Sequence, residues 1–345
     1  MSFHITLQPS GHEYDVEEGS TILQAALDAG IKLPYGCKNG ACGACKGKVI
    51  AGQVDHAAAP EGTLPLDQRA DGMALFCCAK PMSDMVIEAR EVVAGKDIPV
   101  KTLPCRVQKL ERLAPDVIAL QLKLPTNERL QFLAGQYIEI LMKDGKRRAF
   151  SLANAPQEDE LLQLHIRLID GGHFTSQVFG AMKEREMLRF EGPYGSFFLR
   201  EDEASAKKPV ILMAGGTGFA PLKSIVEYAL HSKLERPLHI YWGARDRAGL
   251  YLDALPRRWV AEHAHVHYTP VLSEPATGDD WQGRTGLVHQ AVLADHADLA
   301  NFQVYACGAP AMVEVAHRDF VAQGLPEDEF YSDAFTFAKD ASPKS

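Results

Sequence analysis

The pattern of hydrophobic and polar residues divides the chain into three regions, and the first region mixes strands with one helix. Residues 3–9 alternate as a strand, and residues 13–16 form its hairpin partner. The segment 21–29 has helical character, with Ser20 as its predicted N-cap and Gly30 as its end. Two more strands are expected at residues 47–55 and 85–89. This arrangement predicts a small α+β domain.

Short strands recur from residue 103 onward and form the second region. Turns rich in Pro, Gly, Asn and Asp separate these strands, which is typical of a small antiparallel β-barrel. The strands are expected at residues 105–112, 117–123, 136–141, 148–152 and 161–167.

The pattern changes again after the charged segment 200–208 and indicates a third kind of domain. Apolar strands alternate there with helical stretches such as 221–231, as in a doubly wound α/β fold with a parallel sheet. These strands are expected at residues 210–214, 238–244, 266–271 and 303–307. We therefore predict three domains and a linker, at residues 1–93, 94–102 (the linker), 103–202 and 203–345.

Composition and charge restrict the possible partners of this chain. Its 345 residues are 46% hydrophobic, and no apolar run is long enough to predict a membrane span. A net charge of −9 argues against nucleic acid as a partner. Residues 1–93 carry seven Lys and Arg against twelve Asp and Glu. That acidic surface would suit docking onto a basic protein, or it is an ordinary solvated surface.

Four cysteines of the first region have the spacing that holds a two-iron, two-sulfur cluster. Cys37, Cys42 and Cys45 form C-x4-C-x2-C in one glycine-rich loop, and Cys77 follows later, as in plant-type ferredoxins. The glycines let backbone N–H groups approach the sulfurs. A zinc site would need paired C-x2-C knuckles, and only Cys42 and Cys45 make one. Disulfides are not expected, because no apolar signal segment precedes the loop, so we predict a cytoplasmic protein.

The adjacent Cys77 and Cys78 are two choices for the fourth ligand. We predict Cys77, because the run from Cys77 through Ala79 and Pro81 to Asp84 resembles the fourth-ligand segment of plant-type ferredoxins. Cys78 is then expected to be a buried neighbour. The resemblance also implies a ubiquitin-like (β-grasp) fold for this domain.

The barrel region carries residues suited to a flavin nucleotide. In the segment from Arg148 to Ser151, the arginine could pair with a diphosphate, Phe150 could stack on a flat ring, and the serine could hydrogen-bond a ring nitrogen. A glycine turn at Gly172 enters a helix that contains Thr175, and helix N-terminal amides suit phosphate. Read alone, the first segment is equally an ordinary strand with one surface arginine.

Together with the later Gly192-Pro193-Tyr194-Gly195 segment, these motifs resemble the flavin domain of the ferredoxin–NADP reductase family. The resemblance implies FAD as a cofactor and Ser151 as a residue beside the reacting ring. A phenylalanine stands where tyrosine is commoner, which keeps the stacking face and loses a hydroxyl. The implied FAD contacts are Arg148, Phe150, Ser151, Gly172 and Thr175.

The third region opens with a glycine-rich turn, Gly215-Gly216-Thr217-Gly218, followed by a helix with Pro221 in its first turn. The turn lacks the full G-x-G-x-x-G fingerprint, and a plain strand–helix turn is the alternative. It resembles the nicotinamide domain of the same family. So do the Cys307-Gly308 pair, placed there against the nicotinamide, and the C-terminal Phe335, placed there over the flavin. The implied nucleotide contacts are Gly216, Thr217, Gly218, Pro221, Cys307 and Gly308, and the implied catalytic residues are Ser151, Cys307 and Phe335.

The segment after residue 244 bears on the choice between NADH and NADPH. Asp246 could accept a hydrogen bond from the ribose 2′-hydroxyl and repel a 2′-phosphate, which favours NADH. Arg245 and Arg247 could instead receive that phosphate, so NADPH stays possible.

The three motif sets in this order resemble the iron–sulfur flavoprotein reductases. The resemblance implies transfer of electrons from NAD(P)H to FAD, then to the [2Fe-2S] cluster, then to a partner protein. Within that family the partner is a sugar dehydratase of a deoxysugar pathway, a ring-hydroxylating oxygenase or a di-iron hydroxylase, and we expect the dehydratase. The alternatives are a stand-alone flavin or quinone reductase, which has little need of the acidic first domain, and a redox sensor, which has no use for the nucleotide motifs.

Overall fold

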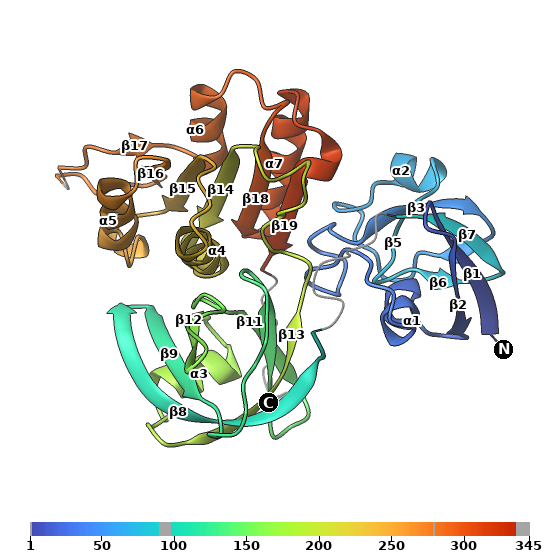
Figure 1. The fold of residues 1–345 in the computed structure, drawn as a ribbon, viewed down its shortest axis with the longest axis horizontal. Coiled ribbons are helices and arrows are strands. Elements are labelled where there is room, and N and C mark those ends of the chain that lie inside the picture. The colour runs from blue at the N-terminus through green and yellow to red at the C-terminus, as the bar shows by residue number, and fades with distance from the viewer. Residues whose placement is uncertain (1, 90–97, 279, 336–345) are drawn as a thin grey trace. The chain divides into compact units, whose positions relative to one another are not determined.

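The computed structural model describes residues 2–89, 98–278 and 280–335, and the ribbon is drawn in Figure 1. The chain forms two compact units. Unit 1 holds the residues up to Pro99, together with Gly195–Phe197 and a segment that begins at Ser332. Unit 2 holds most of the remainder. The predicted linker lies partly outside the described residues.

Unit 1 is a mixed sheet with a helix packed on it. The sheet order is β2-β1-β7-β3-β5, with β1 antiparallel to β2 and parallel to β7. Buried Ile22, Leu23 and Ala26 fix helix α1 to the sheet. The α+β, β-grasp type of fold is confirmed. The elements are β1 (Ser2–Gln8), β2 (His12–Glu17), α1 (Ile22–Asp28), β3 (Lys46–Ala51), β4 (Val54–Asp55), α2 (Leu66–Ala70), β5 (Met73–Leu75), β6 (Lys80–Pro81) and β7 (Met85–Glu88).

Two local predictions in unit 1 are wrong. Thr21, not Ser20, caps α1, because its side chain accepts a hydrogen bond from the Gln24 backbone N–H at 3.2 Å. The strand predicted at 47–55 breaks at Gly52, where φ is +97° and a side chain would meet the Asp84 carbonyl oxygen. The residues beyond the break form β4, which pairs with β6 in a separate two-stranded sheet.

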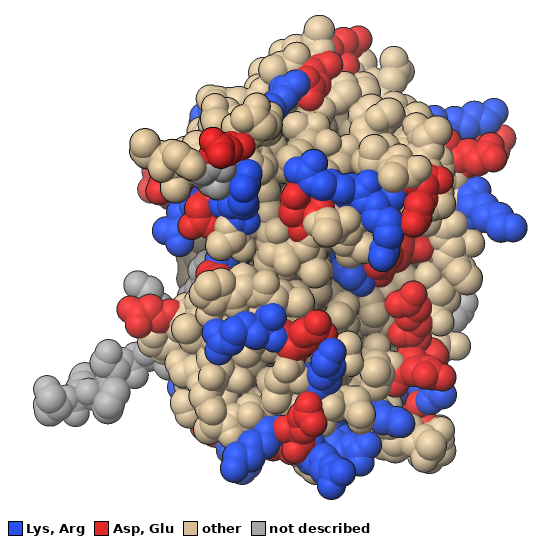
Figure 2. All heavy atoms as spheres, turned by 90° about the vertical axis from the view of Figure 1, so that its left-hand side faces the viewer, with Lys and Arg blue, Asp and Glu red and all other residues tan. Residues whose placement is uncertain are grey.

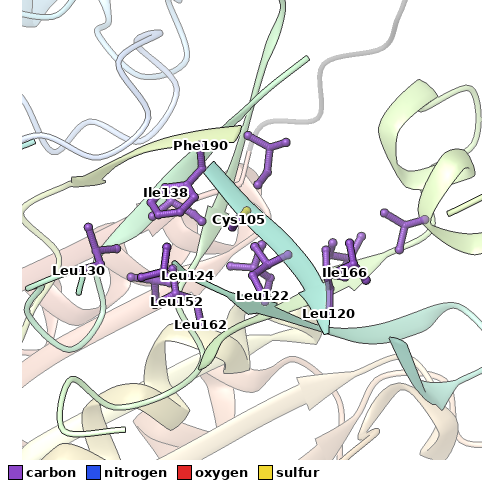
Figure 3. Close-up of a cluster of buried hydrophobic side chains, with 14 of the residues drawn as sticks. Cys105, Leu120, Leu122, Leu124, Leu130, Ile138, Leu152, Leu162, Ile166 and Phe190 are labelled. Atoms are coloured by element: carbon purple, nitrogen blue, oxygen red, sulfur yellow. The ribbon is translucent and has the colours of Figure 1, made fainter. Parts of the chain in front are cut away.

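The first half of unit 2 is the predicted antiparallel barrel. Its strands run in the order β11-β10-β13-β8-β9-β12, and a bridge between Leu152 and Leu164 links the two edges. The buried core includes Leu122, Ile138 and Phe190 (Figure 3). Strand β13 was not predicted, and β8 begins four residues earlier than expected. The elements are β8 (Lys101–Ala114), β9 (Val117–Lys123), β10 (Tyr137–Leu141), β11 (Arg147–Ser151), β12 (Leu161–Arg167), α3 (His173–Phe179) and β13 (Met187–Tyr194).

The second half of unit 2 is the predicted doubly wound sheet, in the order β17-β16-β15-β14-β18-β19. Strand β14 pairs in parallel with both β15 and β18, so the chain order reverses beside β14. Figure 1 shows α4 and α5 on one face of this sheet and α6 and α7 on the other. Ligands of such folds bind at the carboxyl ends of the strands where the order reverses.

The elements of this second half are β14 (Val210–Gly215), η1 (Gly216–Gly218), α4 (Phe219–His231), β15 (Leu238–Ala244), η2 (Arg247–Gly249), α5 (Ala254–Glu262), β16 (Val266–Leu272), β17 (Arg284–Thr285), α6 (Val288–Asp295), β18 (Gln303–Gly308), α7 (Pro310–Ala322), η3 (Glu327–Glu329) and β19 (Phe330–Ala334).

Two surface properties bear on the partners. On the face drawn in Figure 2, Lys and Arg side chains are interspersed with Asp and Glu. That face therefore has no continuous basic area of the kind that binds nucleic-acid phosphates. Among the residues that the structure describes, no helix has the length and apolar character needed to cross a bilayer.

Candidate functional site

The loop between α1 and β3 brings Cys37 and Cys42 together as a pair. The backbone N–H of Cys37 donates to the Cys42 Sγ at 3.4 Å, and the N–H of Cys42 donates to the Cys37 Sγ at 3.3 Å. The pKa of Cys37 is lowered to about 6, first by a hydrogen bond from the Cys42 thiol and then by backbone N–H groups, among them that of Asn39. The loop therefore stabilises a thiolate at Cys37, which is the form that binds iron.

Cys45 and Cys77 form the second pair. A hydrogen bond with Cys45, and then burial, raise the pKa of Cys77, which also interacts with Cys37. Cys77 is 7% exposed, whereas Cys78 is half-buried rather than fully buried as predicted. The Cys78 Sγ lies 3.7 Å from the Cys77 Sγ. Burial raises the pKa of Cys78 to about 12. The Cys77 thiol thus interacts with two of the other predicted ligands, Cys45 and Cys37.

These four thiols fit a two-iron cluster by their chemistry and by the space around them. A [2Fe–2S] cluster takes four thiolates spread over two irons, which suits two pairs of thiols. A side chain at Gly36 would approach the Cys42 Sγ at 3.2 Å, and one at Gly40, where φ is +84°, would approach Pro60 and the Cys78 Sγ at 2.8 Å. Within the described ranges, no group of three His, Cys, Asp or Glu side chains is gathered to hold a single metal ion.

Two later segments of unit 1 contact this cysteine loop, which the sequence did not reveal. The Tyr35 backbone N–H donates to the Ser196 hydroxyl at 2.8 Å, and that hydroxyl donates to the Tyr35 carbonyl oxygen at 2.8 Å. The Ser332 hydroxyl donates to the Cys42 carbonyl oxygen at 3.3 Å. Phe335, the predicted flavin shield, lies half-buried in the same segment of unit 1, and its role at the flavin stays a prediction.

Strand β11 and helix α3 bring the predicted FAD contacts together in the barrel. Phe150 is half-buried, and its ring centroid lies 5.3 Å from that of Phe174 in α3. Ser151 is 6% exposed at the end of β11. In α3, Thr175 donates to the Gly172 carbonyl oxygen at 3.1 Å, and a side chain at Gly172 would meet the Thr175 hydroxyl at 2.6 Å. Gly172 therefore leaves the room that this helix start needs.

Arg148 is half-buried on β11 and donates to the Arg147 carbonyl oxygen at 2.9 Å. An arginine guanidinium presents five N–H donors in a planar fork that can pair with a diphosphate bidentately. The residues on β11 and α3 therefore fit a flavin nucleotide: an arginine for the diphosphate, an aromatic face, and a hydroxyl at the strand end.

The glycine-rich turn and the Cys307-Gly308 pair meet where the strand order reverses. A side chain at Gly218 would lie 2.1 Å from the Cys307 carbonyl oxygen, so only glycine permits this approach. A side chain at Gly308, where φ is +150°, would lie 3.1 Å from the Gly215 backbone nitrogen. The two motifs thus form one cradle of closely packed backbone, at the sheet edge where folds of this kind bind dinucleotides.

Trp242 is a site residue that sequence reasoning missed, since it was interpreted as packing. Its indole N–H donates to the Gly216 carbonyl oxygen at 2.9 Å, and its ring stacks on Phe219 with centroids 3.8 Å apart. The side chain therefore fixes the glycine-rich turn. No local sequence signal distinguishes such a tryptophan from a core residue.

Asp246 follows β15 at the same edge of the sheet. Its carboxylate accepts a hydrogen bond from the Gly249 backbone N–H at 3.0 Å and so caps the turn η2. Pro221 lies in the first turn of α4, which begins at Phe219, two residues earlier than predicted. Thr217 is buried in the turn η1.

Family models match all three regions of the chain. A 2Fe-2S iron-sulfur cluster binding domain matches residues 5–82, an oxidoreductase FAD-binding domain residues 104–199, and an oxidoreductase NAD-binding domain residues 212–318. The CDP-6-deoxy-L-threo-D-glycero-4-hexulose-3-dehydrase reductase of Yersinia pestis is 43% identical over 98% of this chain and 100% of its own length. The chain belongs to the iron–sulfur flavoprotein reductases.

Other relatives of this reductase serve different partners. The reductase component of phenol 2-monooxygenase from Pseudomonas sp. (strain CF600) is 36% identical over 100% of this chain and 98% of its own. The crystal structure of an Amycolatopsis cytochrome P450 reductase is 33% identical, with a TM-score of 0.76 over 96% of this chain and 98% of that one. A ferredoxin NADP+ reductase from Neisseria gonorrhoeae, 17% identical with a TM-score of 0.58, shares the fold of 68% of this chain over 98% of its own.

The reductase is an NAD(P)H-dependent oxidoreductase with domains for a [2Fe-2S] cluster, FAD and NADH. The predicted family, fold class, enzyme class and cofactors are confirmed. When bound, FAD accepts two electrons as a hydride and the cluster carries electrons singly, so the two together connect two-electron and one-electron chemistry.

Proposed function

We propose that this reductase supplies electrons from NADH to a dehydratase that acts on a CDP-linked deoxysugar. The observation that carries the proposal is the 43% identity to the Yersinia pestis reductase over the full length of that protein, whose name pairs it with a 3-dehydrase. The matching phenol 2-monooxygenase and terephthalate 1,2-dioxygenase reductase components are 36% and 33% identical. An oxygenase or hydroxylase component is therefore the second candidate partner.

We infer three domains joined by one linker, and a cytoplasmic location for the protein. Residues 1–93 form the cluster domain, 94–102 the linker, 103–202 the flavin domain and 203–345 the nicotinamide domain. None of the seven cysteines, all of which lie in the described residues, forms a disulfide, which suits the reducing cytoplasm where NADH is found.

Each residue set has one task in this proposal. The thiolates of Cys37, Cys42, Cys45 and Cys77 hold the cluster. Arg148 neutralises the FAD diphosphate, Phe150 stacks on the flavin nucleotide, and the Ser151 hydroxyl bonds the ring. Gly172 and Thr175 shape the helix start that receives phosphate.

The cradle where the strand order reverses would hold the nicotinamide nucleotide. Gly216, Thr217, Gly218, Pro221 and Gly308 form its walls, and the size of the Cys307 side chain sets how closely the nicotinamide meets the flavin. Phe335 would shield the flavin face. Asp246 favours NADH, because its carboxylate repels a 2′-phosphate.

The partner is tested by coupled turnover with two purified acceptors, a CDP-sugar 3-dehydratase and a phenol hydroxylase component. We expect NADH oxidation coupled to the sugar product to be at least about tenfold faster than coupling to hydroxylation, because docking selects the partner. Raising the salt concentration should slow the coupled rate, because the first domain is acidic. Coupling to the hydroxylase alone would establish the second candidate instead.

A further inference from the structure

Two buried polar side chains of helix α4 bond the loop that follows the flavin strand β11. Lys223 is 7% exposed, and its Nζ donates to the Ala153 carbonyl oxygen at 3.0 Å. Ser224 is fully buried, and its hydroxyl donates to the Asn154 carbonyl oxygen at 2.8 Å. Both acceptors lie within three residues of Ser151. Consecutive residues of one helix thus contact consecutive residues of the flavin domain.

The loop that contains Ala153 and Asn154 is itself hydrogen-bonded to the barrel. The Ala153 backbone N–H donates to the Gln163 carbonyl oxygen at 2.8 Å, and the Asn154 side chain accepts from the Gln163 N–H at 2.8 Å. The Asn154 amide also donates to the Glu158 carbonyl oxygen at 2.9 Å. The loop is therefore a fixed support for the helix.

Packing alone does not account for a lysine at this position. A buried ammonium is unfavourable unless it is paired, and an apolar side chain of similar volume is often at least as stable. Lys223 is paired with Glu227 at 2.7 Å, and burial raises the pKa of that carboxyl. The helix thus keeps a buried ion pair where it bonds the flavin loop.

A cleft of about 560 Å³ opens beside this boundary, and its lining mixes polar residues such as Glu158 and Gln163 with apolar residues such as Leu113, Leu252 and Leu255. The hydrogen bonds of Lys223 and Ser224 therefore add directional constraints to the apolar packing of α4, in which Leu222, Ile225 and Val226 are also buried.

The N-terminal end of the same helix carries the nucleotide cradle. Helix α4 begins at Phe219, directly after the turn Gly216–Gly218, and Trp242 fixes that turn. Lys223 and Ser224 follow the turn by about one and a half helical turns, which is roughly 8 Å along the axis. A helix is stiff over this length, so a shift at Lys223 moves the cradle.

We propose that Lys223 and Ser224 are positioning residues for hydride transfer, which hold the nicotinamide cradle at a fixed place relative to the flavin strand. The proposal rests on the assignment of β11 to FAD and of the glycine-rich turn to the nicotinamide nucleotide. The side chains act through the helix and the loop, and they touch neither reacting group.

The test compares Lys223→Met and Ser224→Ala in the full-length holoprotein with the unmodified protein. The first variant keeps the aliphatic stem and removes the ammonium, and the second removes only the hydroxyl. Anaerobic stopped flow gives the rate constant for flavin reduction by NADH and by NADH deuterated at the transferred position. We expect this rate constant to fall about ten- to a hundredfold, since a misplacement of about 1 Å can cost a hundredfold. The FAD content and the dissociation constant of NADH should stay unchanged.

The isotope effect separates positioning from a merely structural role. The slowed step should carry the full primary isotope effect, because hydride transfer itself is slowed. Matched controls are Lys207→Met and Ser232→Ala, which change exposed residues and should reduce flavin at the normal rate.

An unchanged rate constant in both test variants would overturn the proposal, and so would a loss of rate that only follows lost FAD or weakened NADH binding. Weak FAD or NADH binding in an Arg148→Ala or Gly218→Ala variant, by contrast, reports on the site assignment alone.

Discussion

Replacing Cys77 by serine should remove the iron–sulfur cluster, whereas replacing Cys78 by serine should leave it in place. Iron should fall from about two atoms per chain to nearly none in the Cys77→Ser protein, since the cluster needs four thiolates. The Cys77 thiol is buried and hydrogen-bonded to Cys45, whereas the Cys78 thiol is half-buried and hydrogen-bonded to Cys77, although both interact with Cys37. Iron analysis and the visible spectrum measure the result.

The two variants are matched controls for each other, because they change adjacent cysteines in the same way. The opposite outcome, with iron lost from Cys78→Ser and kept in Cys77→Ser, would assign the fourth ligand to Cys78. Zinc without iron in the unmodified protein would contradict the ferredoxin assignment as a whole.

A shortened chain that begins at residue 98 should keep NADH-dependent ferricyanide reduction and lose most cytochrome c reduction. Unit 2 has its own buried cores in the barrel and in the parallel sheet, so we expect it to fold alone. Starting at residue 98 retains all of β8, which begins at Lys101. Ferricyanide activity should stay within about twofold, and cytochrome c activity should fall at least about tenfold, because the one-electron carrier is gone.

The full-length Cys77→Ser protein is the control for this experiment, because it lacks the cluster and keeps the first domain. It should show the same divergence between the two acceptors. Equal survival of both activities in the shortened chain and in Cys77→Ser would favour the stand-alone flavin or quinone reductase.

Local signals in the sequence predicted most of the candidate site. The spacing of Cys37, Cys42 and Cys45 is set within one loop, and the glycine-rich turn lies between one strand and one helix. Such motifs are readable because their residues are close in the chain as well as in space. The same holds for strands β9, β12 and β15, which have the predicted bounds.

Contacts between residues that are distant in the chain could not be predicted from the sequence. Residue 218 must be glycine because a side chain there would collide with the Cys307 carbonyl oxygen. Lys223 donates a hydrogen bond to the Ala153 carbonyl oxygen. Each contact joins residues that are distant in the chain. Trp242 was interpreted as packing because its bond to Gly216 depends on two strands meeting. Ser20 was chosen as N-cap over Thr21 because both residue types suit the position, and only the backbone conformation decides.

The most direct test of the electron path is to add NADH anaerobically to the holoprotein and to record the low-temperature electron paramagnetic resonance spectrum. We expect the signal of a reduced [2Fe-2S] cluster to appear as the flavin absorbance falls, and to approach about one spin per chain with excess NADH. The Cys77→Ser protein should bleach its flavin and show no cluster signal. Complete flavin reduction in the unmodified protein, with its cluster present and still oxidised, would contradict electron transfer from NADH through FAD to the cluster.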